Sequence, residues 1–157
     1  MMVKPVDQLY EAHHGMVFRT AYRITGNAAD AEDVLQTVCL RMVRRDSSST
    51  AIDNPESYLR RSAVNASLDV VRARRENDTL EPERMASSGS CTELADLRDT
   101  LRRELSKLPP RTAEMFAMRF FEGYTNPEIA KLLGISQVVV AVTLHRTRRR
   151  LQKEMGR

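Results

Sequence analysis

Four arginines fall within five consecutive positions near the C-terminus of the sequence, Arg146-Thr147-Arg148-Arg149-Arg150. Guanidinium groups bind phosphate oxygens, and each phosphate that they neutralise releases counterions, so such a run is suited to a nucleic-acid backbone. A run of like charge is also typical of a solvated helix face. The run by itself is consistent with both nucleic-acid binding and a solvated helix face. The predicted elements around it distinguish these two interpretations.

A second group of reactive side chains is the acidic set Asp30, Glu32 and Asp33. Clustered carboxylates can hold a divalent metal for nuclease chemistry, but these three point to successive faces of a predicted helix and have no obvious partner acids elsewhere. They follow Asn27, a good helix cap, and their negative charge complements the positive end of the helix dipole. We therefore predict neither a metal site nor a cofactor here.

Other catalytic arrangements are not evident in the sequence. It shows no Ser/His/Asp or Cys/His arrangement, no phosphate loop and no set of residues with metal-ligand spacing. His13 and His14 are adjacent, so they point to different faces of a helix. Cys39 and Cys91 are predicted to be reduced thiols with packing and linker roles, although both could in principle sense oxidation. These observations argue against an enzyme.

The arginine run belongs to the last of three helices predicted between Leu108 and Met155. Pro109 and Pro110 cannot lie inside a helix, so the first helix is expected to begin near Arg111 and to end at Glu122-Gly123. The second helix starts with a capping box, in which Thr125 and Glu128 exchange hydrogen bonds, and Gly134 ends it.

Ser136 is expected to cap the third helix. Its predicted inward residues are Val140, Leu144 and Leu151, and its predicted outward residues are His145, Arg146, Arg149 and Lys153. A short helix, a glycine turn and a basic second helix form a helix-turn-helix pattern, which favours DNA binding over a plain helical hairpin. The apolar run from Val138 to Val142 could pass for a strand, but the cap before it and the basic residues after it favour a helix.

The rest of the chain is also predicted to be helical, over residues 8–25, 27–45, 54–75 and 93–108. The expected buried stripe of the second helix is Val34, Leu35, Val38, Leu40 and Met42, and the apolar stripe of the fourth is Leu94, Leu97, Leu101, Leu105 and Leu108. A polar loop is expected at 46–53. We predict an all-α protein with a helical domain at 1–75, a flexible linker at 76–92, and a helix-turn-helix domain at 93–157.

The bulk properties suit such a protein. The formal net charge of +4 fits a polyanionic partner without requiring one, and the 5% aromatic content offers few platforms for stacking bases. No apolar run approaches a membrane span, and the N-terminus lacks a signal-peptide pattern. We therefore expect a cytoplasmic protein that does not insert into a membrane.

Four sequence features occur in a fixed order along the chain. They are Asp30-Ala31-Glu32-Asp33-Val34-Leu35-Gln36, Asn54-Pro55-Glu56-Ser57-Tyr58-Leu59-Arg60-Arg61 with Asn65, Asp69 and Arg72, Leu108-Pro109-Pro110-Arg111, and Leu144-His145-Arg146-Thr147-Arg148-Arg149-Arg150-Leu151. Together they resemble the extracytoplasmic-function (ECF) group of bacterial RNA polymerase sigma factors. The resemblance spans nearly the whole chain and implies that 1–75 is a region 2-like domain and 93–157 a region 4-like domain. It also implies that the protein binds core polymerase, recognises the −10 and −35 promoter elements and helps open the downstream one.

The resemblance implies a polymerase-binding surface on the acidic helix. The residues that it assigns to the contact with the β′ clamp helices are Asp30, Glu32, Asp33, Gln36 and Leu40. A charged, exposed helix start suits this role through complementary charge, although helix capping explains the same acids. Thr37 and Cys39 depart from the acidic and aromatic residues that are common in the family. The β flap of polymerase is a further partner that the resemblance implies.

The loop at 46–53 and the helix after it resemble the reader of the downstream promoter element. The residues implied are Asp46, Ser47, Ser48 and Ser49, with Arg60, Arg61, Asn65, Arg72 and Arg75. Small hydroxyl and carboxyl groups can surround a base that has left its stack, and arginines can hold the backbone of melting DNA. Asn65 and Asp69 lie one helical turn apart and could instead form a structural pair.

The last helix resembles the one that enters the major groove of the upstream promoter element. The residues implied in this contact are Arg111, Ser136, Gln137, Val138, Ala141, Val142, His145, Arg146 and Arg149. The segment from Val138 to Thr143 departs from the small and basic residues usual in the family. Methyl groups of valine, alanine and threonine can contact thymine methyls but cannot make the bidentate guanine contact of arginine. Upstream specificity is therefore expected to be unusual, or weaker and more dependent on phosphate contacts.

Three other functions compete with a sigma factor. An autonomous helix-turn-helix regulator would bind DNA without polymerase, but the acidic helix and the long linker argue against it, and no self-association helix is evident. An enzyme lacks the arrangements named above. A divergent sigma-like protein would bind polymerase but recognise promoters poorly. The resemblance also implies an anti-sigma protein that covers the DNA-binding and polymerase-binding faces.

Overall fold

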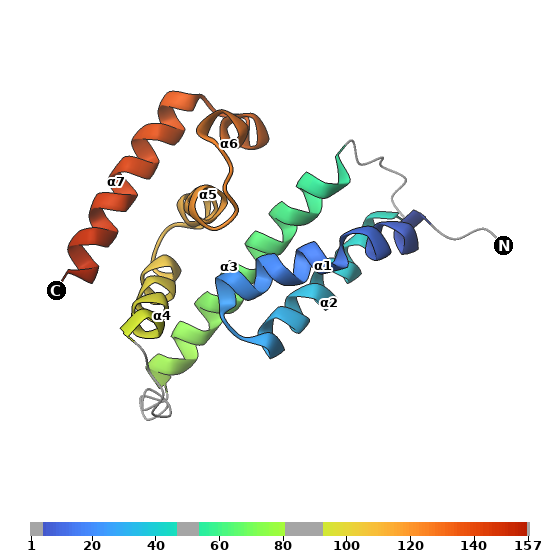
Figure 1. Ribbon diagram of the computed structural model, residues 1–157, viewed down its shortest axis with the longest axis horizontal. Coiled ribbons are helices and arrows are strands. Elements are labelled where there is room, and N and C mark those ends of the chain that lie inside the picture. Colours follow the sequence, from blue (N-terminus) through green and yellow to red (C-terminus); the bar gives the residue numbers. More distant parts are fainter. Residues whose placement is uncertain (1–4, 47–53, 81–92, 157) are drawn as a thin grey trace. The chain divides into compact units, whose positions relative to one another are not determined.

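The computed structural model describes residues 5–46, 54–80 and 93–156, and these residues form seven helices and no strand (Figure 1). The prediction of an all-α protein is confirmed. The chain divides into two compact units, residues 1–70 and 71–157, so the boundary between them falls within the third helix.

The first unit begins with a helical hairpin of α1 (Pro5–Thr25) and α2 (Ala28–Asp46), which pack on each other (Figure 1). The two-residue joint between them explains where each helix stops. Gly26 adopts a φ of 68°, a conformation that glycine tolerates better than other residues, and its N–H donates to the Tyr22 carbonyl at 2.7 Å. Asn27 then accepts a hydrogen bond from the Asp30 N–H on its side-chain oxygen at 3.1 Å, as the predicted cap requires.

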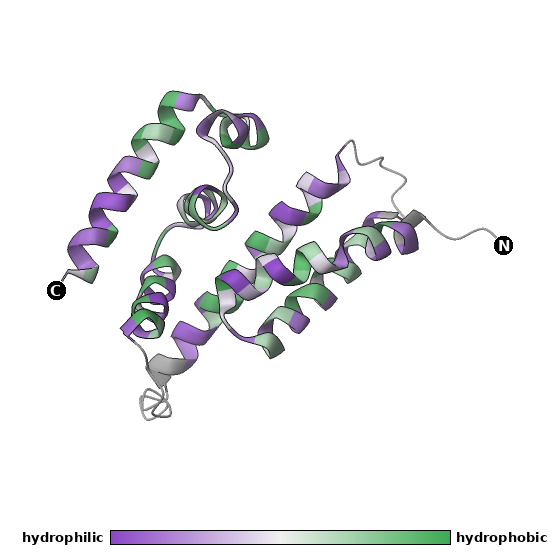
Figure 2. Ribbon diagram, viewed as in Figure 1, coloured by the Kyte–Doolittle hydropathy of each residue, from purple (hydrophilic) through white to green (hydrophobic). Residues whose placement is uncertain are grey.

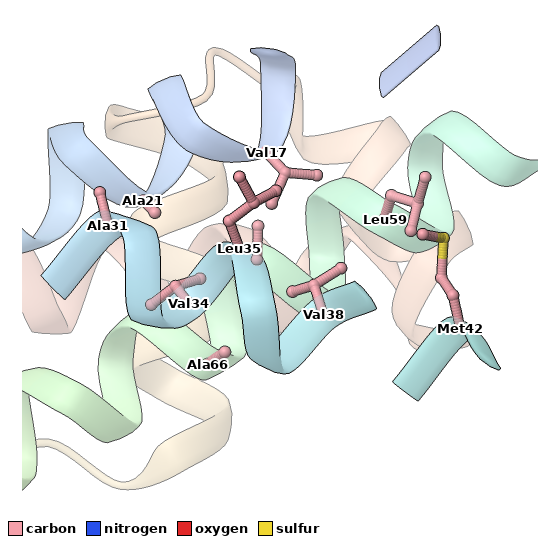
Figure 3. Close-up of a cluster of buried hydrophobic side chains, with 10 residues drawn as sticks. Val17, Ala21, Ala31, Val34, Leu35, Val38, Met42, Leu59 and Ala66 are labelled. Atoms are coloured by element: carbon pink, nitrogen blue, oxygen red, sulfur yellow. The ribbon is translucent and has the colours of Figure 1, made fainter. Parts of the chain in front are cut away.

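The core of the first unit is built by α1, α2 and the start of α3 (Pro55–Leu80). Figure 3 shows side chains from all three helices converging, with Met42 of α2 directed towards Leu59 of α3. The buried cluster comprises Val17, Ala21, Ala31, Val34, Leu35, Val38, Met42, Leu59, Ala63 and Ala66. Cys39 is half-buried and packs against this cluster, which agrees with its predicted packing role.

The predicted buried stripe of α2 is wrong at Leu40, whose side chain is 58% exposed. Val38 and Met42 are spaced four residues apart and both face the core, whereas Leu40 lies between them. Residues two positions apart point about 200° away from each other on a helix. Leu40 is therefore directed to solvent by the same geometry that buries its neighbours.

Helix α3 begins where its sequence signals place it and ends later than predicted. The Asn54 side-chain oxygen accepts the Ser57 N–H at 3.2 Å, and Pro55 is the first helical residue. The helix then continues to Leu80, so the first residues of the segment 76–92, predicted to be a flexible linker, are helical. The remainder of that segment, 81–92 with Cys91, lies outside the described residues, and the division into domains at 1–75 and 93–157 stays a prediction.

The second unit contains α4 (Glu93–Ser106), α5 (Pro110–Phe120), α6 (Asn126–Leu133) and α7 (Gln137–Met155). Helix α7 packs against each of the other three, and α5 also packs against α6. Pro110 is the first residue of α5, one position before the predicted start, because its missing N–H would have no partner in a first turn. The apolar stripe of α4 is exposed at Leu94 (56%) and Leu97 (51%) and becomes buried at Leu105.

The helices of the described residues range in length from 8 to 26 residues. No single helix among them is long and apolar enough to cross a membrane. Helices α6 and α7 reach the required length and hydropathy only as a pair, and the chain direction bends by 113° between them.

Candidate protein-binding and DNA-binding surfaces

One side of α2 presents acidic and apolar side chains together. Glu32, Asp33 and Gln36 are exposed, as are Leu40 (58%) and Val43 (54%). We call these five residues the α2 outer face, because at about 100° per residue they lie opposite the core side of the helix. Sequence reasoning named four of them and missed Val43, although its spacing of three residues from Leu40 is the spacing of neighbours on a helix surface.

Capping does not account for the whole acidic cluster. Asn27, and not an acid, supplies the side-chain oxygen that caps α2, and Asp30 is half-buried whereas Glu32 and Asp33 are exposed. The structure thus places Asp30 apart from the α2 outer face. In the part of the chain that the structure describes, no group of three or more His, Cys, Asp or Glu side chains is arranged to hold a metal ion.

Cys39 lies beside the α2 outer face and is poorly suited to sensing oxidation. Burial raises the pKa of its thiol above the ordinary value for cysteine. The thiolate is the reactive form, so a raised pKa keeps the group protonated and less nucleophilic.

The predicted downstream reader begins at the junction of α2 and α3. Asp46 is the last residue of α2 instead of a loop residue, and Ser47, Ser48 and Ser49 lie outside the described residues. The Arg45 guanidinium lies 4.8 Å from the centre of the Tyr58 ring. This cation–π contact joins the last turn of α2 to the first turn of α3.

The basic residues of α3 do not all share one face. Arg60 donates to the Glu56 carboxylate at 3.0 Å, whereas Arg61 is turned about 100° away from it. Arg61 and Asn65 are half-buried and one helical turn apart, so they lie on the same side of α3. Arg72 and Arg75, also half-buried, lie further along the helix, in the second unit.

Helix α6 starts with the predicted capping box. The Thr125 hydroxyl oxygen accepts the Glu128 N–H at 3.3 Å, and the Glu128 carboxylate accepts the Thr125 N–H at 3.0 Å and the Thr125 hydroxyl at 2.9 Å. The backbone and side-chain hydrogen bonds from Thr125 hold the pKa of Glu128 below its usual range, because they favour the charged carboxylate.

The lowered pKa of Glu128 predicts an acid-sensitive helix start. A carboxylate whose pKa is lower in the folded state stabilises the fold above its unfolded pKa, and that contribution is lost as pH falls through the folded pKa. Glu128→Gln keeps an acceptor but cannot titrate. We expect this variant to have a lower melting temperature than wild type at neutral pH, and the difference to shrink as the pH falls below the ordinary glutamate range. Thermal melts followed by circular dichroism, with Glu154→Gln as an exposed control, test this, and parallel pH profiles for wild type and Glu128→Gln would contradict it.

The joint between α6 and α7 has the geometry of a helix-turn-helix. Gly134 caps α6 with a φ of 67°, and the Ser136 hydroxyl oxygen accepts the Val139 N–H at 3.2 Å to start α7. The bend of 113° between the helices lies within the range of about 90–120° that is typical of this motif. The predicted turn and cap are confirmed.

Arg111, which sequence reasoning assigned to DNA, also holds this joint. Its Nη2 donates to the carbonyl oxygen of Leu133, the last residue of α6, at 2.7 Å. A cation at the C-terminal end of a helix satisfies an unpaired carbonyl and complements the helix dipole. The contact spans residues far apart in sequence and therefore leaves no local signal.

Removing the Arg111 side chain is expected to loosen the helix-turn-helix. Arg111→Ala loses a charge-assisted hydrogen bond, which should lower the free energy of unfolding by about 1 kcal/mol. Denaturant unfolding measures this loss, and amide hydrogen exchange after Leu133 localises it. Arg111→Lys keeps the charge and should lose less. Unchanged stability and exchange in Arg111→Ala would show that the side chain does not hold the joint.

Helix α7 separates a buried side from a basic side. Val140, Leu144 and Leu151 are buried, and the four predicted outward residues His145, Arg146, Arg149 and Lys153 are exposed, so both predictions are confirmed. Thr147 is 5% exposed and donates its hydroxyl to the Thr143 carbonyl at 2.7 Å. The break in the arginine run is thus the one position of the run that faces inward. Gln137, Val138, Ala141 and Val142 are exposed at the start of the helix.

Two protein families match separate parts of the chain. Residues 9–77 match the family described as Sigma-70 region 2, and residues 98–151 match Sigma-70, region 4. The RNA polymerase sigma-E factor of Streptomyces avermitilis is 32% identical over 150 residues, which cover 95% of this chain and 84% of the relative. The ECF RNA polymerase sigma factor SigM of Mycobacterium tuberculosis is another relative, 28% identical over 96% of this chain and 76% of its own length. The chain belongs to the ECF family of RNA polymerase sigma factors.

Solved structures show the same fold. The sigma factor RpoE of Bartonella quintana, crystallised in complex with the anti-sigma factor NepR, aligns with a TM-score of 0.57 at 18% identity over 96% of each chain. The ECF sigma factor SigJ of Mycobacterium tuberculosis aligns with a TM-score of 0.51 at 24% identity, over 91% of this chain and 52% of SigJ. As an ECF sigma factor, this chain directs promoter-specific initiation by core RNA polymerase, and an autonomous DNA-binding regulator is not favoured.

Proposed function

We propose that this sigma factor binds polymerase and promoter DNA through three separate surfaces. The α2 outer face binds the β′ clamp helices of core polymerase, the α2–α3 junction reads the downstream element, and α6–α7 binds the upstream element. The proposal is supported mainly by the arrangement of α7. This helix follows a bend of 113°, and its basic residues are exposed on the side opposite its buried residues. An exposed basic helix after such a turn is suited to a DNA groove.

The polymerase contact is supported by the composition of the α2 outer face. Glu32 and Asp33 offer charge that can steer the encounter with a basic partner, and Leu40 and Val43 offer apolar area that can be buried on binding. Asp30, which is half-buried, is assigned a supporting role in the same contact. We assign the β flap to the second unit as a further polymerase contact.

The DNA contacts divide into those that position the protein and those that recognise sequence. In α7, Arg146 and Arg149 are exposed and suited to phosphates, and we assign the exposed Gln137 and Val138 of the first turn to base edges. Ser136, Ala141, Val142, His145 and Arg111 complete the proposed upstream surface. The proposed downstream surface comprises Asp46, Ser47, Ser48, Ser49, Arg60, Arg61, Asn65, Arg72 and Arg75.

An anti-sigma protein is the regulatory partner that we propose. The Bartonella quintana RpoE structure contains such a partner, NepR. Solvent-exposed Leu40 and Val43 are apolar groups that a bound partner would remove from water. We place the protein in the cytoplasm with polymerase and DNA, and we assign it no catalytic step.

Transcription in vitro tests the proposal directly. Purified core polymerase is supplied with a library of promoter sequences, with and without this protein. Protein-dependent transcripts that share two spaced upstream motifs are the expected result. No stimulation and no binding to core polymerase would overturn the proposal, whereas binding without transcription would indicate a sigma-like protein that does not recognise promoters.

A further inference from the structure

The start of α7 presents apolar side chains on a helix that is otherwise basic. Val138 is 71% exposed, the highest value among the large apolar side chains of the described residues, and Val142 is 41% exposed. Figure 2 shows hydrophobic residues at the α6 end of α7 and mostly hydrophilic residues further along. Val139 between the two valines is 48% exposed, so the first turns of α7 carry three exposed valines whose apolar area a partner could bury.

The two valines lie on the same side of α7 as its basic residues. Val138 and Val142 are four residues apart, so their side chains are neighbours on the helix surface. Arg146 and Arg149 continue this side at helical spacing and are exposed, whereas Val140 lies on the opposite side and is buried. The apolar surface thus continues into a face whose charge complements DNA phosphates.

Few polar side chains in the first turns of α7 are available to form hydrogen bonds with bases. The Ser136 hydroxyl oxygen already accepts the Val139 N–H as the helix cap, and Thr143 is half-buried. No arginine or lysine occurs between Gln137 and Leu144. A bidentate guanine contact from this part of α7 is therefore impossible, and Gln137 is the exposed side chain that remains for an adenine contact.

We propose that Val138 and Val142 select thymines in the upstream promoter element by packing against their C5-methyl groups. Thymine is the only base with a methyl group at the major-groove edge. The inference rests on the proposed placement of α7 in the major groove. It specifies the base that the first turns of α7 prefer and the contact through which they recognise it.

The experiment uses the complete sigma factor bound to core polymerase. Promoter duplexes with a randomised upstream window are selected for binding to this holoenzyme, and thymines are expected to be enriched at neighbouring positions. Each enriched thymine is then replaced by deoxyuridine, which removes the methyl group and leaves base pairing unchanged. Loss of one methyl contact should weaken promoter binding roughly fourfold, the equivalent of about 0.8 kcal/mol for one buried methyl-sized group. Deoxyuridine outside the upstream window is the control for the DNA.

Substitution of the two valines tests whether they are the side chains that contact the thymine methyl groups. Val138→Ala and Val142→Ala remove methyl groups from exposed side chains, so folding should be unaffected. Each is expected to bind the thymine promoter roughly fourfold more weakly and to become insensitive to deoxyuridine at one position. Leu94→Ala is the control, because Leu94 is 56% exposed in α4 and lies outside the proposed DNA surface. It should keep the full sensitivity to deoxyuridine.

The outcomes separate this inference from the proposed function. A selected motif whose binding is unchanged by deoxyuridine, or whose sensitivity survives both valine substitutions, would overturn methyl recognition while leaving a working sigma factor. Selection of no upstream motif by an active holoenzyme would also overturn it and would point to a protein partner for the valines. Failure to form a holoenzyme would instead overturn the proposed function.

Discussion

Leu40→Asp is expected to weaken binding to core polymerase by tenfold or more. Leu40 is 58% exposed near the middle of the α2 outer face, where an apolar side chain buried in a complex acts as an anchor. Aspartate removes this anchor and introduces an unpaired charge that the interface would have to bury. Together these changes should reduce the binding free energy by more than about 1.4 kcal/mol, which is a tenfold loss of affinity. Equilibrium binding of labelled sigma factor to core polymerase measures the effect.

The control for this prediction is an exposed side chain elsewhere in the same unit. Tyr22 of α1 is 50% exposed and lies outside the α2 outer face, so Tyr22→Asp should bind polymerase like wild type. Circular dichroism melts of both variants establish that they fold. If a folded Leu40→Asp variant bound core polymerase with unchanged affinity, the α2 outer face would not be the polymerase contact.

The double variant Arg146→Ala, Arg149→Ala is expected to lose much of the affinity for the upstream element. Both side chains are exposed on the outward side of α7, and alanine preserves the helix. Each lost phosphate contact should reduce the slope of log affinity against log salt concentration by about 0.9, so the pair should reduce it by about two. The loss should be similar for all upstream sequences, since phosphate contacts carry no sequence information.

A salt titration of holoenzyme binding to promoter DNA measures both the affinity and the slope. Arg103→Ala serves as the control, because Arg103 is an exposed arginine of α4 that lies outside the proposed DNA surface. An unchanged salt slope in the double variant would show that α7 does not lie along the phosphate backbone. A loss confined to particular sequences would instead give these arginines a role in base recognition.

The starts of α2, α3, α6 and α7 could be predicted because their causes are local. The caps at Asn27, Asn54 and Ser136 each bond to an N–H three residues ahead, and the Thr125–Glu128 box spans the same distance. Such signals can be read from a few consecutive residues. The outward side of α7 was also predictable, since burial at helical spacing leaves the remaining residues exposed.

The errors concern properties that depend on distant parts of the chain. Leu40 fits an apolar helix pattern, but its exposure depends on which side of α2 the other helices cover. The bond from Arg111 to Leu133 joins residues of two different helices, so no local pattern marks it. The roles proposed for individual polymerase-binding and DNA-binding residues, including those at 47–49, stay predictions.

The inward position of Thr147 limits how strongly α7 can attract DNA. This residue is 5% exposed and satisfies its hydroxyl within the helix, so a lysine or arginine in its place would have to bury a charge. The fold thus limits the number of positive charges that α7 can carry, because position 147 within the arginine run has to be neutral. Extra positive charge on α7 can be accommodated only at exposed positions, such as Gln152 and Glu154, which are not basic. Further electrostatic attraction of DNA by α7 would therefore have to come from its last turns, beyond the arginine run.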